Sequence, residues 1–585
     1  MTALPVGRLL ALVLPILAVG LFARALYTPD EPREASLVVS MAAQPNKSLP
    51  ALAGYSFAEK PPLLYWAGAA SVGLTGSSPP SLRLPNLLYA LAAVLALGAL
   101  GARAAGATAG FATSLCAATA LQSYQAMIWL ATDAPLLAGV AVAMFGAFSG
   151  LTASERRPRL AGYLTMHAGL LVAFFAKGPA GWLVPGAAFV TVLVAEQRPR
   201  ELLRAELWAG VPVLGLVIGA WVWWVDQGPD GAEQLRVLFW YNLVGRVLHL
   251  DAPTALDYSS GHQNSFGKYL LEWPMYLLPW TALAVAALRR VPRAFSAQGA
   301  EGTAWRLAAG AVAIPTLLLS FAATARGVYY APVLLGFALG IGLYAGRAGA
   351  ALDRFERGCW RATGLLVALL ALLLSLVVAL LCFAPALRTV GSVALGAVAL
   401  ASAALAAWLA LTPPVAAAGG LPRLALAVTL ILTLVVGPAY GQLNKVLSLE
   451  TLAARIRAAA GPGFLIVAEP DETTVAMFEL YFPERANRVM LVPNYPLVGC
   501  VLQADVAFHG LGTRVVTGVR DAPRWGLAAW LEYLGYRRAS AAPVVAAAVP
   551  ADWLRVAARV ERPGGRAFVV LAPTSVPPAP PTPCS

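Results

Sequence analysis

The sequence predicts a polytopic α-helical membrane protein of about thirteen spans, followed by a soluble C-terminal α/β domain. Its 585 residues are 59% hydrophobic and only 12% charged, with a mean hydropathy of +0.70, whereas soluble domains carry about a quarter charged residues. Several windows of roughly 20 residues with almost no charge are long enough to cross a hydrocarbon core about 30 Å thick. The chain is therefore expected to be embedded in a membrane.

The net charge of +13 would also suit a nucleic-acid-binding protein. No basic surface interleaved with aromatic residues is found outside the loops, so nucleic acid is not an expected partner. In a membrane protein, Lys and Arg instead collect in the cytoplasmic loops and set the orientation.

The apolar stretches divide the first three quarters of the chain into spans. The first stretch, Leu9 to Leu26, follows Arg8 and lacks a clear small-residue cleavage site, which favours a retained span over a removed signal peptide. The predicted spans cover residues 8–27, 82–101, 106–122, 127–150, 160–176, 178–196, 207–225, 269–288, 304–322, 328–346, 360–384, 389–412 and 422–441.

Clusters of arginine in alternate loops orient these spans. By the positive-inside bias, the loops that carry them are cytoplasmic, which places residues 28–81, 226–268 and 442–585 on the opposite side, facing the periplasm or the exterior. The arginines are Arg103, Arg156, Arg157, Arg159, Arg198, Arg200, Arg204, Arg289, Arg290, Arg293, Arg347, Arg354 and Arg357.

Three domains or segments are expected. Residues 1–441 form the transmembrane domain with its extracytoplasmic loops, residues 442–572 form an α/β domain, and the Pro-rich tail 573–585 is predicted to be disordered. In the α/β domain, the pattern predicts strands at 464–468, 488–492, 513–516 and 567–571, and helices at 472–482 and 525–536.

The charged residues next to the predicted spans are the best candidates for functional residues. Placing an ionisable group near hydrocarbon costs several kcal/mol unless the group is paired or functional. Asp30 and Glu31 follow the first span, and both are candidate catalytic carboxylates. Asp30 suits either an N-cap for a helix that Pro32 and Arg33 begin or a carboxylate that orients or deprotonates an acceptor hydroxyl.

Two further motifs carry charges on the same side. Lys60, in Glu59-Lys60-Pro61-Pro62, either snorkels to the interface or binds a lipid phosphate, held in place by stiff neighbours. Asp133 lies in an otherwise uncharged run before Pro135. A carboxylate within a membrane span is by default a candidate functional residue, and helix capping is the alternative role.

Three outer cations complete the set. Lys177 interrupts two apolar runs at a Gly-Pro turn, Arg246 ends the stretch FWYNLVGR, and Arg326 begins RGVYYAP. Each of these residues alone is compatible with a role as a topology anchor. The positive-inside bias, however, does not explain positive groups on the extracytoplasmic face. Together they are the arrangement that binds a phosphate or diphosphate leaving group.

A family resemblance rests on the first extracytoplasmic loop. DEPREASLVVSMA from Asp30, followed after a gap by FAEKPPLLYW ending at Trp66, resembles the aminoarabinose transferases that modify lipid A. These are similar to the protein O-mannosyltransferase-like enzymes of the GT-C glycosyltransferase fold. Thirteen spans with a soluble C-terminal domain also resemble that family, so the resemblance covers nearly the whole chain, weakening after about residue 335.

The resemblance implies roles for individual residues. It places Asp30 at the catalytic centre with Asp133, and Lys60 and Arg246 on the carrier phosphate. The RGxYxxP stretch implies a basic and aromatic cluster near the phosphate, formed by Arg326 and Tyr329.

A divalent metal is the one cofactor that the resemblance raises. In the family, a His five residues before the phosphate-binding Arg is thought to help bind a metal together with the loop Glu, here Glu59. Tyr241 stands at the His position in this sequence, so no cofactor is required, although a metal at Glu59 remains compatible with the motif.

The predicted function is therefore a glycosyltransferase that moves a sugar from a polyprenyl-phosphate donor to a lipid A-like lipid, a glycan or a protein at the periplasmic face. A transporter or flippase of lipid-linked sugars is the alternative, against which stands the lack of paired inverted halves with interrupted segments. A sensor or scaffold with a binding domain outside the membrane is a third interpretation.

Overall fold

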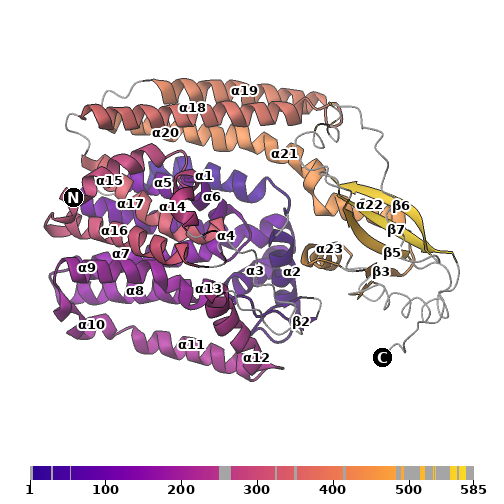
Figure 1. Cartoon of the computed structure of the whole chain (residues 1–585), viewed down its shortest axis with the longest axis horizontal. Helices are drawn as coiled ribbons and strands as arrows, with labels where there is room; N and C mark the ends of the chain where they lie inside the picture. The colour runs from indigo at the N-terminus through magenta and orange to yellow at the C-terminus, as the bar shows by residue number, and fades with distance from the viewer. Residues whose placement is uncertain are drawn as a thin grey trace.

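The computed structural model is a long helical body with a β-sheet at one end (Figure 1). It describes residues 4–27, 30–52, 54–248, 265, 267–322, 324, 326–347, 352–412, 417–468, 470–482, 489–492, 514–520, 531, 534, 536, 554–562 and 566–574. The helices run roughly along the long axis of Figure 1, and α18–α20 form a layer along its upper edge.

Helices coincide with every predicted span. The helices of the first half are α1 (Val6–Phe22), α4 (Pro79–Ala105), α5 (Ala107–Thr119), α6 (Leu121–Ile128), α7 (Asp133–Thr152), α8 (Arg156–Lys177), α9 (Leu183–Ala195), α10 (Ala205–Trp208) and α11 (Val211–Asp226). Those of the second half are α14 (Lys268–Tyr276), α15 (Thr281–Phe295), α16 (Gly299–Ser320), α17 (Ala331–Arg347), α18 (Arg354–Cys382), α19 (Val390–Leu411), α20 (Ala417–Leu430) and α21 (Val436–Leu447).

The count of spanning helices differs from the predicted thirteen. By length and composition, nine helical segments of the described chain could cross a membrane, with α8 to α9 (Arg156–Ala195) counted as one segment, or ten if α14 and α15 are counted as one span. α1 has 17 residues and α5 only 13, which is below the roughly 20 that a bilayer requires. The predicted span 269–288 is bent by 120° between α14 and α15, so it is a broken or re-entrant segment and not one straight helix.

The chain reverses direction between α8 and α9, as predicted for two separate spans. A Cβ added at Gly181 would lie 2.3 Å from the carbonyl oxygen of Ala173, so the short 3-10 helix η1 (Gly178–Trp182) folds back on the end of α8. At the other end of α9, Glu201 accepts a hydrogen bond from the Tyr163 hydroxyl near the beginning of α8. Lys177 therefore lies at the turn.

Three groups of shorter elements lie between the long helices in the sequence. α2 (Asp30–Ala43) and α3 (Leu63–Thr75) belong to the first loop, together with the two-residue strands β1 (Ala51–Leu52) and β2 (Tyr55–Ser56). α12 (Gly231–Arg236), the π-helix η3 (Val237–Gly245) and α13 (Arg246–Leu248) belong to the second loop. η5 (Gly327–Tyr330) precedes α17.

The C-terminal region forms an α/β unit. Its five-stranded sheet has the order β4-β3-β5-β7-β6, in which β3 pairs in parallel with β4 and β5, and β7 pairs antiparallel with β5 and β6. The strands are β3 (Leu465–Ala468), β4 (Val489–Val492), β5 (Arg514–Arg520), β6 (Leu554–Arg562) and β7 (Arg566–Pro573), with helices α22 (Leu449–Ala460) and α23 (Glu472–Tyr481).

This unit matches the predicted elements except at two places. β6 was not predicted, and most of the helix predicted at 525–536 lies outside the described residues, as does the tail from 575. In Figure 1, α23 lies between the sheet and α2, and the side chain of Leu480 packs against the apolar cluster of α2 and α3. The C-terminal unit is therefore in contact with the loop that carries Asp30.

Candidate active site

Five charged residues from three distant segments form a continuous chain of ion pairs at the outer end of the helical body. Arg326 Nη2 lies 2.5 Å from Asp30 Oδ2, and Asp30 Oδ1 lies 4.0 Å from Arg33 Nη2. Arg33 Nη2 lies 3.3 Å from Glu59 Oε2, and Glu59 Oε1 lies 2.8 Å from Lys60 Nζ. We refer to these five residues as the ion-pair chain. It connects Asp30 to Lys60 through Arg33 and Glu59.

Arg33 is the centre of this chain. Besides Asp30 and Glu59, its guanidinium lies 2.8 Å from Glu34 and 2.8 Å from Glu472 of α23. Burial alone would lower the pKa of Arg33, but Glu59, Glu34 and Glu472 together raise that pKa well above its usual value. One arginine thus organises carboxylates from the first loop and from the C-terminal unit, a geometry that the forked guanidinium suits.

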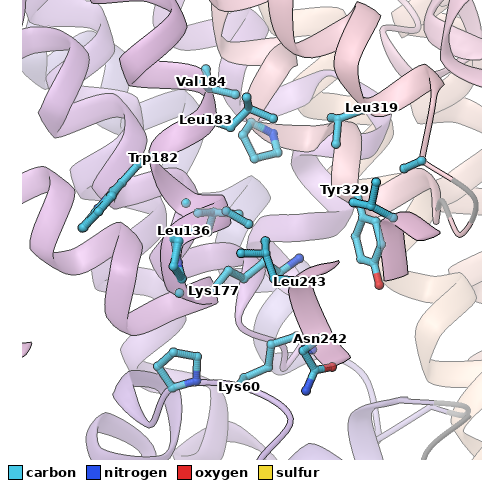
Figure 2. Close-up of a pocket in the computed structure, with 18 of the residues that line it drawn as sticks. Lys60, Leu136, Lys177, Trp182, Leu183, Val184, Asn242, Leu243, Leu319 and Tyr329 are labelled. Atoms are coloured by element: carbon cyan, nitrogen blue, oxygen red, sulfur yellow. The ribbon is translucent and has the colours of Figure 1, made fainter. Parts of the chain in front are cut away.

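A cavity of about 560 Å³ opens beside Lys60. Figure 2 shows Lys60 and Asn242 at one end of it and Leu183, Val184 and Leu319 at the other. The lining is mostly apolar, with its polar groups gathered at the end nearer the loops. The residues that line it include Glu59, Lys60, Leu136, Val140, Lys177, Leu183, Val184, Leu238, Asn242, Leu243, Val247, Leu318, Leu319 and Tyr329.

Lys177 adds a second cation to this cavity. Its Nζ lies 2.5 Å from Asp133 Oδ1 and 4.9 Å from the centroid of the Tyr329 ring. Both charged side chains are largely buried, with 12% of Lys177 and 7% of Asp133 exposed. Asp133 is therefore the ion-pair partner of Lys177, whereas Asp30 is paired with Arg326 and Arg33. This geometry favours an indirect role for Asp133, which is to position Lys177.

Glu31 differs from the other predicted site residues. Its side chain is fully buried, and its two oxygens accept hydrogen bonds from Arg24 at 2.6 and 2.7 Å and from Arg83 at 3.0 and 3.1 Å. The backbone N–H groups of Tyr27 and Leu130 also donate to it. With its oxygens so occupied, Glu31 has no lone pair facing a substrate, and we infer a structural role in place of the catalytic one expected from the sequence.

The remaining predicted residues lie at the edges of the site. Arg326, 52% exposed, precedes η5, which carries Tyr329. Burial would lower the pKa of Arg326, but Asp30 raises it above its usual value. Arg246 begins α13, four residues after the cavity residue Asn242, but its side chain lies outside the described part of the chain.

Glu59 is the metal ligand that the sequence predicts, and a metal ion there would require further ligating side chains beside it. Among the described residues, no group of three or more His, Cys, Asp or Glu side chains is placed to hold a metal ion. Glu59 is instead paired with Lys60 and Arg33, and Tyr241, at the family's His position, is buried beside Arg236.

Some residues that build the site were not singled out by the sequence. Arg33 follows Asp30 in the DEPR motif, so proximity to the motif was the available signal. Arg83, fully buried at the start of a span, carries the signal of a charge inside an apolar run. Glu472 and Asn242 carry no such signal, because nothing local distinguishes them from ordinary surface residues.

Comparison with solved structures places the whole chain in one fold. The crystal structure of ArnT from Cupriavidus metallidurans bound to undecaprenyl phosphate superposes with a TM-score of 0.68 over 97% of both chains, at 18% sequence identity. Its apo form gives 0.66 over the same share. The chain has the GT-C fold and resembles the aminoarabinose transferases.

Sequence comparisons agree with this resemblance over parts of the chain. Residues 59–224 match the family described as dolichyl-phosphate-mannose-protein mannosyltransferase. The undecaprenyl phosphate-alpha-4-amino-4-deoxy-L-arabinose arabinosyl transferase of Pseudomonas aeruginosa strain UCBPP-PA14 is 26% identical over 285 residues, 47% of this chain and 49% of the relative. The enzyme of the same name from Aeromonas hydrophila is 26% identical over 419 residues, 69% of this chain and 70% of the relative. The chain thus matches only about half the length of the Pseudomonas relative.

Proposed function

We propose that this protein transfers a sugar from a polyprenyl-phosphate donor to an acceptor at the periplasmic face of the inner membrane. The observation that carries the proposal is the position of Lys60, which ends the ion-pair chain and also lines the polar end of a largely apolar cavity. An amphipathic donor requires this combination, with hydrocarbon contacts for the prenyl chain and cations for the phosphate. The GT-C fold and the resemblance to undecaprenyl-phosphate-dependent transferases support the same conclusion.

The reaction exchanges one bond for another at the anomeric carbon. An acceptor oxygen attacks that carbon, the bond to the carrier phosphate breaks, and the electron pair leaves with the phosphate oxygen as polyprenyl phosphate. Lys60 and Lys177, with Arg246 and Arg326 as further candidates, stabilise the negative charge that develops on the phosphate. Preorganised cations in a site with little water are the most effective way to do so.

Asp30 is the proposed acceptor-binding residue. Arg326 and Arg33 hold its carboxylate at the start of α2, where it orients a hydroxyl acceptor and takes the proton that the hydroxyl loses. An acceptor that is already a phosphate has no such proton, and Asp30 then only positions it. We propose no metal in this step, because Glu59 is engaged by Lys60 and Arg33.

The direct test uses purified full-length protein, a labelled polyprenyl-phosphate sugar and a membrane extract as the source of acceptors. The wild-type protein is expected to move label onto an acceptor, and Asp30→Asn and Lys60→Ala to abolish transfer while the protein is still produced and folded. Asp226→Asn, at an exposed carboxylate that ends α11, is the matched control and should retain activity. Full activity in both site variants, or label that only crosses a liposome bilayer unchanged, would contradict the proposal.

A further inference from the structure

A second cavity, of about 490 Å³, lies at the opposite end of α7 from the candidate active site. Its lining comes from four helices: Arg103 of α4, Phe145, Phe148, Ser149 and Thr152 of α7, Pro158, Ala161, Gly162 and Thr165 of α8, and Ala300 of α16. The active-site cavity touches α7 at Leu136 and Val140, whereas this one touches it at Phe145, Phe148, Ser149 and Thr152. At 1.5 Å per helical residue the centres of these two sets are about 16 Å apart along the helix, so the cavities lie beside opposite halves of α7.

Arg103 is an exposed residue at the edge of this cavity, and its described contacts there are with neutral groups. Its Nη1 donates a 3.0 Å hydrogen bond to Ser149 Oγ, and its guanidinium carbon lies 4.6 Å from the centroid of the Phe145 ring. Within the described part of the chain, no carboxylate lies within 4.0 Å of it. A guanidinium has five N–H donors in a planar fork, so most of its hydrogen-bonding capacity remains for a ligand.

Several residues close to this second cavity are also positively charged. Arg156, Arg157 and Arg159 lie within one turn of the lining residue Pro158 at the beginning of α8. Arg156 pairs with Glu206, and Arg159 donates to the backbone carbonyls of Ala153 and Ser154. Glu155 and Glu301 are the nearest carboxylates in sequence to the cavity residues, and Glu301 is paired with Arg347. The distribution of arginines predicts that this end of the molecule faces the cytoplasm.

We propose that this cavity binds the headgroup phosphate of an anionic phospholipid from the leaflet opposite the active site. The Arg103 fork suits two phosphate oxygens, and the Ser149 hydroxyl holds the fork in place. Phe148, Ala161 and Gly162 provide an apolar wall for the glycerol and the first methylenes of an acyl chain. Basic pockets between membrane helices on the cytoplasmic side are a known way of binding anionic lipids.

The experiment is lipid binding to the purified full-length protein in detergent, counted by native mass spectrometry during titration with dioleoylphosphatidylglycerol. Arg103→Ala should weaken the tightest binding event by about tenfold or more, the loss expected when a charge-assisted pair worth ~1.5–3 kcal/mol is removed. Ala161→Leu, which fills the cavity and keeps the charge, should weaken it as well. Arg357→Ala is the matched control, because Arg357 is an exposed arginine outside the cavity, and it should bind lipid as the wild type does.

Three results would overturn the assignment. One is unchanged lipid binding in both Arg103→Ala and Ala161→Leu. Another is an equal loss in Arg357→Ala, which would show that only the overall charge matters. The third is equal binding of dioleoylphosphatidylcholine, or full displacement of the lipid by millimolar inorganic phosphate, which would show that the site does not select an anionic lipid.

Discussion

Arg33 sets the geometry of the candidate active site, because a single guanidinium contacts Asp30, Glu59 and Glu472. Replacing it with Lys keeps the charge but removes the planar fork, so one ammonium cannot hold all three carboxylates in the same places. A misplacement of about 1 Å is enough to cost on the order of 100-fold in rate.

We therefore expect Arg33→Lys to lower the initial rate of sugar transfer by about 100-fold, measured with labelled donor at saturating concentration. Because Arg33 positions Asp30, the proposed acceptor-binding residue, the loss should fall on kcat more than on the KM for the donor, whose proposed ligands are Lys60 and Lys177. Glu472→Gln, which removes only a half-exposed partner, is the milder comparison. A variant whose defect lies entirely in KM would show that Arg33 contacts the donor instead.

At the level of single residues, the sequence located the charged groups but not their partners. Asp30, Lys60, Lys177 and Arg326 could be predicted because a charge beside hydrocarbon needs a reason to be there. The role of Arg33 could not, because its partner Glu472 is 439 positions away. Glu31 was given a catalytic role because it is adjacent to Asp30, and adjacency in the sequence does not reveal that its carboxylate is buried between Arg24 and Arg83.

Among the helices, the buried Arg24–Glu31–Arg83 cluster fixes the start of α2. Arg83 belongs to α4, and Arg24 directly follows α1, where it also donates to the Gly20 and Ile128 carbonyls. Arg83 donates to the carbonyls of Leu21, Arg24 and Ala25. The first turn of α2, and with it Asp30, is thereby tied to α4 and to the residues that follow α1.

Glu31→Gln should consequently destabilise the protein strongly. The substitution leaves two buried arginines without their counter-charge, and breaking a buried pair in this way costs about 3–5 kcal/mol. The measurement is the unfolding midpoint in detergent, followed by tryptophan fluorescence. Glu472→Gln is again a control, since an ion pair of a half-exposed carboxylate contributes about 0–1 kcal/mol. Equal midpoints for the two variants would show that the cluster does not stabilise the fold.

The sequence predicted helices well because a run of apolar residues forms a helix wherever it is buried in lipid or protein. Only its length distinguishes a membrane span from a shorter buried helix. At 106–122 the apolar run suggested one long span, because it continues across the break at Ala120 that separates α5 from α6. The break between α14 and α15 contains Pro279, a helix breaker, but the apolar run continues across it. β6 was missed because two adjacent alanines interrupt the alternation of apolar and charged residues in LRVAARVER, where the strand has a register shift between Val556 and Ala558.

For the whole molecule, the C-terminal unit is attached to the outer end of the helices at two places. Asn444 of α21 accepts hydrogen bonds from the backbone N–H of Ala25 and from the Tyr27 hydroxyl, and it donates to the Ala23 carbonyl. α23 contributes Glu472 to Arg33, and Glu479 accepts a hydrogen bond from the Ser36 hydroxyl. If the first loop is periplasmic, the C-terminal unit must be periplasmic too.

The orientation predicts which single cysteines a membrane-impermeant maleimide labels in intact spheroplasts. Tyr55→Cys, in the first loop and 80% exposed, should be labelled at once, and Arg157→Cys, at the exposed start of α8, only after permeabilisation. The background should lack Cys500 and Cys584, whereas Cys116, Cys359 and Cys382 are buried. The reverse labelling pattern would place the candidate active site in the cytoplasm.

The central claim is that the carrier phosphate binds between Lys60 and Lys177 at the polar end of the apolar cavity. Its most direct test is the affinity of the purified protein for undecaprenyl phosphate, by native mass spectrometry or by quenching of intrinsic tryptophan fluorescence. Lys60→Met and Lys177→Met should each weaken binding by about tenfold or more, and Arg357→Ala should not. Wild-type affinity in both lysine variants would contradict the account.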